Sequence, residues 1–390
     1  MKKGIVSLLG GIGILLFVLI GNSRGSMLDP GAMGGRASGM GGAVVANADD
    51  LMSAFYFNPA GLTEIGGTNL AIGSTFSDLR VRYESPQGYD QENSFDPFVP
   101  FLGWATDSFG PTIVGIGMYS TMGVGFEFKE DPAHGIDGDI VSKSGVMFLA
   151  PTIAYKVNPK LSMGVELNIG YGKSEMDQPT PGGYLEMEAD GLGYGVSVGV
   201  LYKLSPSLNL GLCWRSPMHT SQEGDARLGG IKHDLDLDVY WPQMLSFGMG
   251  YKFTPDLLLA FSLKWSDWSY FDKSKVSFNN AESPFAKDTR DGWRLNVGAE
   301  YRVNSRLTLH AGYIYDWYSF QSEWISPMLM DTSFYELRTG ATIEFEKIQI
   351  NFNYVYTFFT FRNVSESFVG YPGRYGGYMP AIGFEVSYRF

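Results

Sequence analysis

The side chains that could carry acid–base or nucleophilic chemistry are few and scattered along the 390-residue chain. Of the four histidines, only His310 clearly falls in a segment with strand-like alternation, and no serine or aspartate stands at a spacing that identifies a catalytic dyad. The histidines are His134, His219, His233 and His310. We therefore expect no catalytic residue, metal site or cofactor, with a hydrolase that uses His310 as the alternative.

Two further features could suggest chemistry, and both favour a structural role. The single cysteine, Cys213, cannot form an internal disulfide, and its place between Leu212 and Trp214 in a predicted strand favours an inert side chain. The glycine-dense stretch 31–42 could be a phosphate-binding loop, but it lacks the preceding strand, the following helix and the lysine that such a loop needs. The formal charge of -12 argues against nucleic acid as a partner.

The elements that must position any site are strands. Residues 383–390 alternate strictly between two faces, as a strand with one apolar and one polar face does. Glycine and aromatic residues recur in many such runs, which is the signature of transmembrane strands. Six short polar turns, roughly 42 to 50 residues apart, separate pairs of runs. The turns are 107–110, 157–160, 204–207, 253–256, 303–306 and 345–348.

Six tight turns at one end imply seven hairpins if both termini lie at that end. The sequence therefore predicts an all-β, 14-stranded antiparallel transmembrane β-barrel in residues 67–390. A soluble β-sandwich would also alternate, but its strands usually run five or six residues and these run roughly ten to fifteen. The predicted strands are 67–83, 97–107, 110–122, 143–157, 160–174, 189–204, 207–220, 233–252, 256–271, 288–303, 306–321, 333–345, 347–362 and 377–390.

The N-terminal residues are typical of an exported protein. Lys2 and Lys3 precede an apolar run from Ile5 to Ile20, and small residues follow it. This order predicts a cleaved signal peptide in residues 1–25, with a transmembrane anchor as the alternative.

Residues 26–66 are too irregular for a strand and, with the hydrophobic residues 51–57, too apolar for a disordered linker. Small residues, apolar anchors and a proline suit a compact plug inside the barrel. We expect this segment, an N-terminal hatch, to close the lumen.

The hatch carries a family resemblance. Its glycine-rich opening, the Ala48-Asp49-Asp50 stretch and Asn58-Pro59-Ala60-Gly61 resemble the N-terminal hatch of the FadL family of outer-membrane transporters for long-chain fatty acids and aromatic hydrocarbons. Similar segments follow in the family's order over essentially the whole mature chain. They include 99–100, 120–128, 151–158, 192–195, 214–217, Pro242, Trp265 and 290–294.

The resemblance implies a route and a set of site residues. Extracellular loops would capture a long-chain fatty acid or another hydrophobic molecule, and the substrate would leave sideways through a kink in the third strand at Gly123-Val124-Gly125-Phe126. The glycines there weaken pairing and permit bulges, although they could instead relieve crowding against the hatch. By similarity, Lys173 and Arg290 would meet a fatty-acid carboxylate, with solvated surface charge or lipopolysaccharide contact as the ordinary alternative.

We therefore expect a passive transporter of hydrophobic compounds in the outer membrane of a Gram-negative bacterium, monomeric and surrounded by lipid and lipopolysaccharide. A general porin would show large open-channel conductance, whereas a plugged barrel should not. An adhesin role through the long loops is compatible with transport.

Overall fold

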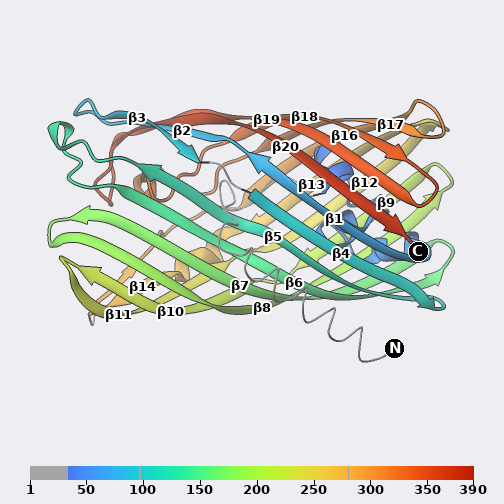
Figure 1. The fold of residues 1–390 in the computed structure, drawn as a ribbon, viewed down its shortest axis with the longest axis horizontal. Coiled ribbons are helices and arrows are strands. Elements are labelled where there is room, and N and C mark those ends of the chain that lie inside the picture. The colour runs from blue at the N-terminus through green and yellow to red at the C-terminus, as the bar shows by residue number, and fades with distance from the viewer. Residues whose placement is uncertain (1–33, 96–97, 280) are drawn as a thin grey trace.

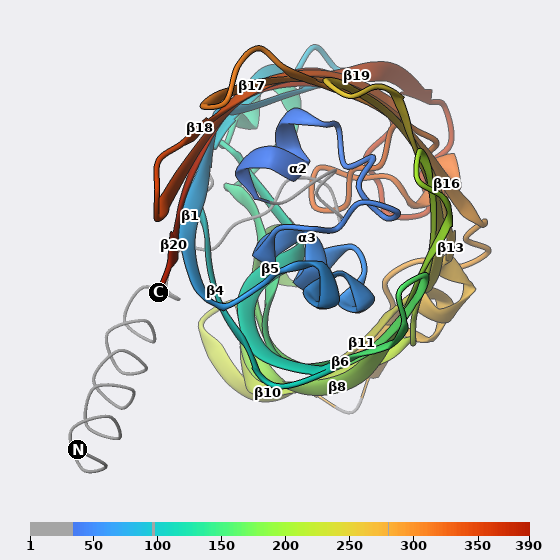
Figure 2. The same ribbon diagram turned by 90° about the vertical axis from the view of Figure 1, so that its right-hand side faces the viewer.

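The computed structural model of the chain describes residues 34–95, 98–279 and 281–390. These residues form one closed antiparallel β-barrel with short helices inside it (Figures 1 and 2). The predicted signal peptide, residues 1–25, and the start of the predicted hatch lie outside the described residues. Within the described ranges, no helix is both long and apolar enough to cross a membrane.

In the described part of the chain, fourteen strands form a continuous wall, in which each strand pairs with the next and the last pairs with the first. The predicted fold class is therefore confirmed. The wall strands are β1 (Thr68–Ser77), β4 (Phe98–Phe109), β5 (Thr112–Phe128), β6 (Ile140–Asn158), β7 (Leu161–Thr180), β8 (Gly183–Ser205), β9 (Leu208–Arg215), β12 (Gln243–Thr254), β13 (Leu257–Asp267), β16 (Gly292–Arg302), β17 (Leu307–Asp316), β18 (Phe334–Glu344), β19 (Ile348–Val364) and β20 (Gly373–Arg389).

Six shorter strands extend this wall at the end that carries the long loops (Figure 1). Pro217 and Pro242 fall at two of the breaks between wall strands and extensions, where a missing N–H group costs no ladder hydrogen bond. The extensions are β2 (Leu79–Glu84), β3 (Asp90–Phe95), β10 (Met218–Leu228), β11 (Ile231–Trp241), β14 (Lys275–Phe278) and β15 (Ala281–Pro284).

The strand boundaries differ from the predicted ones at several places; the first predicted strand, 67–83, divides into β1 and β2, and the eleventh, 306–321, ends at Asp316. The third predicted strand, 110–122, continues to Phe128, and the hairpin of β7 and β8 runs on to a tight turn at 180–183. The ninth, predicted to reach residue 271, ends at Asp267, whose carboxylate caps the 3₁₀ helix η4 (Trp268–Lys273). Local capping outweighs the apolar alternation of this segment.

The outer face of the wall is apolar over most of its height. Val165 and Leu167 of β7 are about half exposed, as are many large hydrophobic side chains around the barrel. Such a surface would be unfavourable in water and fits a lipid environment. On β7 the apolar series ends where Lys173 begins the charged tip.

The hatch is used below for residues 34–66, which lie inside the barrel (Figure 2). Local capping fixes its short turns. Asp50 accepts a hydrogen bond from the Ser53 N–H at 2.8 Å, and Asn58 accepts one from the Ala60 N–H at 3.2 Å. Its elements are α2 (Gly35–Gly39), α3 (Leu51–Tyr56) and the 3₁₀ helix η2 (Pro59–Glu64).

Glycines of the wall form the surface on which the hatch rests. A methyl group added at Gly164 of β7 would collide with the Pro59–Ala60 backbone, and one at Gly248 of β12 would lie 2.7 Å from the Val45 Cβ. Side chains at these positions would hold the two backbones apart.

We predict that Gly164→Leu displaces the hatch without preventing barrel formation. Overpacking at such a contact costs about 1–3 kcal/mol, and the hatch is the part that can move. Single-channel conductance in planar bilayers should rise. Val165→Leu, which places the same side chain on the outer face of β7, is the control and should leave conductance unchanged. A conductance of Gly164→Leu equal to that of wild type would contradict the prediction.

Candidate functional site

An apolar cavity of about 350 Å³ lies in the half of the barrel that carries the long loops. None of its described lining residues is charged. The lining consists of Ser142, Ser144, Gly145, Ser174, Met176, Gln178, Met187, Gln222, Leu237, Val239, Trp241, Phe271, Val276, Ser283, Pro284, Phe285, Trp324, Ser326, Met328, Leu329, Val369 and Tyr371. This volume and character are those of a site for an uncharged, mostly apolar small molecule.

An aromatic layer separates this cavity from the lumen on the hatch side. The Phe271 ring, which lines the cavity, lies 5.1 Å from the ring of Phe320 in an edge-to-face arrangement. Phe320 and Trp268, whose rings lie 5.5 Å apart, line a smaller space below. Rings at these separations attract one another, edge-to-face for Phe271 and Phe320 and tilted for Phe320 and Trp268, so the three side chains form one packed layer.

The loop 317–333, between β17 and β18, carries Phe320 into the barrel. The Asp331 carboxylate accepts hydrogen bonds from the Ser319 N–H at 2.7 Å and the Phe320 N–H at 2.8 Å. Arg362 of β19 donates to the Phe320 carbonyl at 2.6 Å and to the Asp331 carbonyl at 2.7 Å. Burial raises the pKa of Asp331, and the two N–H donors and Arg362 offset part of that effect.

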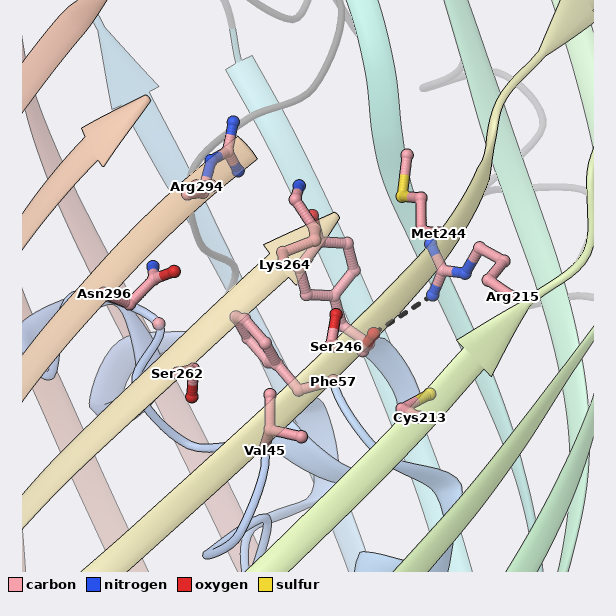
Figure 3. A pocket seen from close by; sticks show the side chains of 12 residues that line it. Val45, Phe57, Cys213, Arg215, Met244, Ser246, Ser262, Lys264, Arg294 and Asn296 are labelled. Atoms are coloured by element: carbon pink, nitrogen blue, oxygen red, sulfur yellow. Dashed lines mark hydrogen bonds between the residues drawn. The ribbon is translucent and has the colours of Figure 1, made fainter. Parts of the chain in front are cut away.

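The lumen between this layer and the hatch is narrow and charged. A space of about 50 Å³ lies among Arg215, Lys264 and Arg294, which project from β9, β13 and β16 (Figure 3). A second space of about 40 Å³ lies beside Asp316 and Asp331. Moving each CH₂ group from an apolar site into polar, water-like surroundings costs roughly 0.8 kcal/mol of transfer free energy. Movement from the cavity toward the hatch is therefore unfavourable for an apolar molecule.

A buried polar network ties the hatch to the wall. Glu166 of β7 is fully buried and accepts a hydrogen bond from the Tyr119 hydroxyl of β5 at 2.7 Å. Arg215 donates to the Tyr56 carbonyl of the hatch at 3.0 Å (Figure 3). Its Nε donates to the Ser197 hydroxyl at 3.3 Å, and that hydroxyl lies 3.4 Å from Glu166. The network therefore joins α3, β5, β7, β8 and β9.

The seam between β4 and β5 is interrupted. In the described part of the chain their ladder ends at the pair Leu102–Met118, whereas β5 continues to pair with β6 as far as Phe128. The β5–β6 register shifts between Ser120 and Met122, so Thr121 is an extra residue, a β-bulge. We call residues 119–126 of β5 the window edge.

The window edge is held at its upper end by side chains in place of a ladder. The Glu127 N–H donates to Asn93 Oδ1, and the Lys129 N–H donates to Gln91 Oε1 at 3.1 Å; both acceptors belong to β3. These bonds bound the seam above, and the β4–β5 ladder bounds it below.

The window edge lies next to the apolar cavity. Its backbone pairs with Ser142, Ser144 and Gly145 of β6, and all three line the cavity. Across β6, the window edge lines up with residues 170–176 of β7, a stretch that includes Lys173, where the apolar belt ends. A cavity, an interrupted seam and the border of the lipid-facing surface thus coincide.

The predicted kink residues lie in this window edge. Gly123 pairs with Gly145, and the Val124 backbone pairs with Ser144. Gly125 pairs with Lys143. Phe126, which pairs with Ser142, is fully buried.

The hatch residues singled out in the sequence contact the wall. The Asn58 amide donates to the Val200 carbonyl of β8 at 3.1 Å and to the Val45 carbonyl at 2.9 Å. Pro59, Ala60 and Gly61 follow it in η2 and are buried.

The two predicted substrate cations are not brought together in the cavity. The Lys173 ammonium group lies 2.8 Å from Glu188 Oε1 with about half of its side chain exposed. Arg290 is exposed, and its backbone N–H donates to the Ser319 carbonyl at 2.8 Å. Neither residue lines the cavity, so their role with a carboxylate stays a prediction. The alternation of the sequence already indicated that Lys173 faces outward, because it lies on the same face of the strand as Val165 and Leu167.

Of the residues considered for catalysis, His310 is buried and its Nε2 lies 2.8 Å from the Thr342 hydroxyl. Cys213 is buried beside Arg215, as an inert side chain would be. The sequence interpretation missed Gln222, Trp241 and the 317–333 loop as parts of the cavity. The alternation of side chains along β10 and β11 could have placed Gln222 and Trp241 on the inner face.

A sequence profile described as "Outer membrane protein transport protein (OMPP1/FadL/TodX)" matches residues 19–390. The chain belongs to this family. The family consists of outer-membrane transport proteins of Gram-negative bacteria. Its activity is transport, so the hydrolase alternative is not favoured.

Individual relatives are distant in sequence. Outer membrane protein P1 of Haemophilus influenzae is 25% identical over 308 residues, which cover 67% of this chain and 66% of that protein. The long-chain fatty acid transport protein of Escherichia coli K12 is 21% identical over 374 residues, 80% of this chain and 82% of that protein. The chain thus spans about two thirds of the length of P1.

Solved structures share the fold. A FadL homologue of Pseudomonas aeruginosa superposes with a TM-score of 0.82 at 17% identity, covering 94% of this chain and 100% of that one. The toluene transporter TodX of P. putida superposes with a TM-score of 0.76 at 16% identity, covering 93% and 99%.

We predict that Asp331→Ala loosens the 317–333 loop while the barrel stays folded. The substitution removes the acceptor for two backbone N–H groups, and each hydrogen bond to a charged group contributes about 1.5–3 kcal/mol. Limited proteolysis of the purified protein should cut this loop faster than in wild type. Asp288→Ala, in the neighbouring loop, is the control; equal cleavage rates for wild type and Asp331→Ala would contradict the prediction.

Proposed function

We propose that this transporter takes uncharged hydrophobic molecules from the outside into its apolar cavity and releases them sideways between β4 and β5. The main support is the uncharged cavity of about 350 Å³, whose lining includes the β6 residues that pair with the window edge. Transport of this kind is passive, because it follows the gradient of the solute and uses no cofactor.

The charged lumen below the cavity supports the sideways direction. An apolar solute that moved toward the hatch would pass Arg215, Lys264 and Arg294, and then a polar space of about 640 Å³ at the tight-turn end. A solute that moved through the seam would instead meet the border of the apolar outer face. Lipid is the better solvent for such a molecule.

The hatch serves as a plug in this proposal. The hatch occupies the tight-turn half of the lumen. Close contacts with wall glycines and hydrogen bonds to several strands hold it there. A general porin needs an open water-filled path there, so the low conductance expected for this chain separates the two functions.

The range of substrates in the named relatives extends from long-chain fatty acids to toluene. For this chain the lining favours the neutral part of that range, because a carboxylate in an uncharged, apolar site would lack a paired charge. We propose that Lys173 and Arg290 meet anions at the outer surface, either fatty-acid carboxylates before entry or lipopolysaccharide. The wall closes on itself through the pairing of β1 with β20, which supports a monomer surrounded by lipid.

We predict that deletion of Thr121 closes the lateral route. Removal of the extra residue restores an even β5–β6 register, so β5 can straighten toward β4. Cells that produce the variant should take up a radiolabelled apolar solute no faster than cells without the protein. Heat-modifiable migration in gels checks that the barrel is folded; wild-type uptake by a folded variant would sink the lateral exit.

We predict that Lys173→Ala and Arg290→Ala leave neutral compounds bound to the purified protein and change only the amount of bound fatty acid. Both side chains lie outside the cavity, so they act on anions alone. Mass spectrometry of co-purifying apolar material is the measurement. Loss of neutral lipids in either variant would contradict a surface role.

A further inference from the structure

One side chain in the cavity has an unused hydrogen-bonding atom. Gln222 of β10 is 2% exposed and lines the cavity. Its Oε1 atom has no hydrogen-bond partner among the described residues, and its Nε2 atom lies 3.5 Å from the Thr220 hydroxyl. This oxygen is itself buried at the wall of the cavity, so the side chain must turn for a ligand to reach it. A buried acceptor without a donor weakens a fold, so its presence beside a cavity needs an explanation.

The wall fixes the position of this amide. Gln222 pairs with Gly191 of β8, and Gly191 pairs with Gly172 of β7, so two neighbours in the same row lack side chains. A Cβ atom added at Gly172 would lie 2.9 Å from Gln222 Nε2. The nitrogen end therefore packs against the wall, and the glycines leave room for the side chain to lie along it.

The surroundings are polar without being charged. Ser144 and Ser174 pair directly across β6 and β7 in the row next to Gly172, and both line the cavity. The other described lining residues are mostly aromatic or aliphatic. Such a site can orient one neutral polar group on an apolar body, whereas a carboxylate would find no opposite charge.

The volume admits a ligand of more than one ring. A cavity of roughly 150 Å³ already holds benzene, and this one measures about 350 Å³. The cavity therefore has room for a molecule larger than a single unsubstituted ring.

We infer that Gln222 is a specificity-determining residue, whose Oε1 accepts a hydrogen bond from a neutral hydroxyl or N–H group on an otherwise apolar ligand. This inference rests on the proposed function and narrows it. The cavity prefers hydroxylated apolar molecules, such as polycyclic phenols or long-chain alcohols, over both the matching hydrocarbon and the matching carboxylate.

The test uses three ligands with the same ring system: naphthalene, 2-naphthol and 2-naphthoate, each radiolabelled. Equilibrium binding to the detergent-solubilised protein gives three dissociation constants for each variant. Gln222→Met keeps the length of the side chain and removes its acceptor. We expect this variant to bind 2-naphthol roughly fivefold to tenfold more weakly than wild type, since one neutral hydrogen bond is lost, and to bind naphthalene as wild type does.

The control is Gln243→Met. The Gln243 amide lies outside the cavity, where it accepts from Trp214 Nε1 at 3.3 Å and donates to Asp267 Oδ2 at 3.0 Å. This variant should bind all three ligands as wild type does, and heat-modifiable migration should show that both variants are folded.

Three results would overturn the inference while leaving the proposed function intact: equal weakening of naphthalene and 2-naphthol by Gln222→Met, no change in either, or tightest wild-type binding of 2-naphthoate together with retained naphthalene binding. Failure of wild type to bind any of the three would instead overturn the proposed function.

Discussion

The fold depends on close backbone contact between the hatch and wall positions that have no side chain. A fourteen-stranded barrel is too wide for its own inward side chains to fill. Gly164 and Gly248 allow the hatch backbone to reach the wall, where hydrogen bonds such as Asn58 to the Val200 carbonyl satisfy its polar groups. Without this contact the lumen would be a water channel, and an apolar cavity above it could not stay dry.

Given that filling, the lumen divides into two environments. The hatch half holds charges such as Arg215 and the buried Glu166, while the cavity in the loop half has no charged residue in its described lining and is separated from the hatch half by aromatic rings. The boundary between the halves lies near Tyr119, which contacts Glu166 and also begins the window edge. The same strand that closes the polar half therefore leaves the ladder beside the apolar half.

Much of this architecture could be predicted from the sequence, because alternation and turn residues are local signals. The strands and tight turns follow from them. The interrupted seam could not be predicted in detail, since pairing of Leu102 with Met118 and the break beyond it depend on neighbours distant in the chain. The infolded loop around Asp331 also has no periodicity to reveal it. Lys173 is the opposite case. Its alternation with neighbouring residues indicated an outward side chain, but the family resemblance suggested a role with substrate.

The seam between β1 and β20 has a consequence for biogenesis. The hatch precedes β1 in the chain, yet its Gly35 N–H donates to Glu385 of β20 at 2.7 Å, and other hatch residues bond strands in between. These bonds can all be present together only when the wall surrounds the hatch. We therefore expect the barrel to insert into the membrane and to enclose the hatch in one concerted event, which ends when β1 pairs with β20.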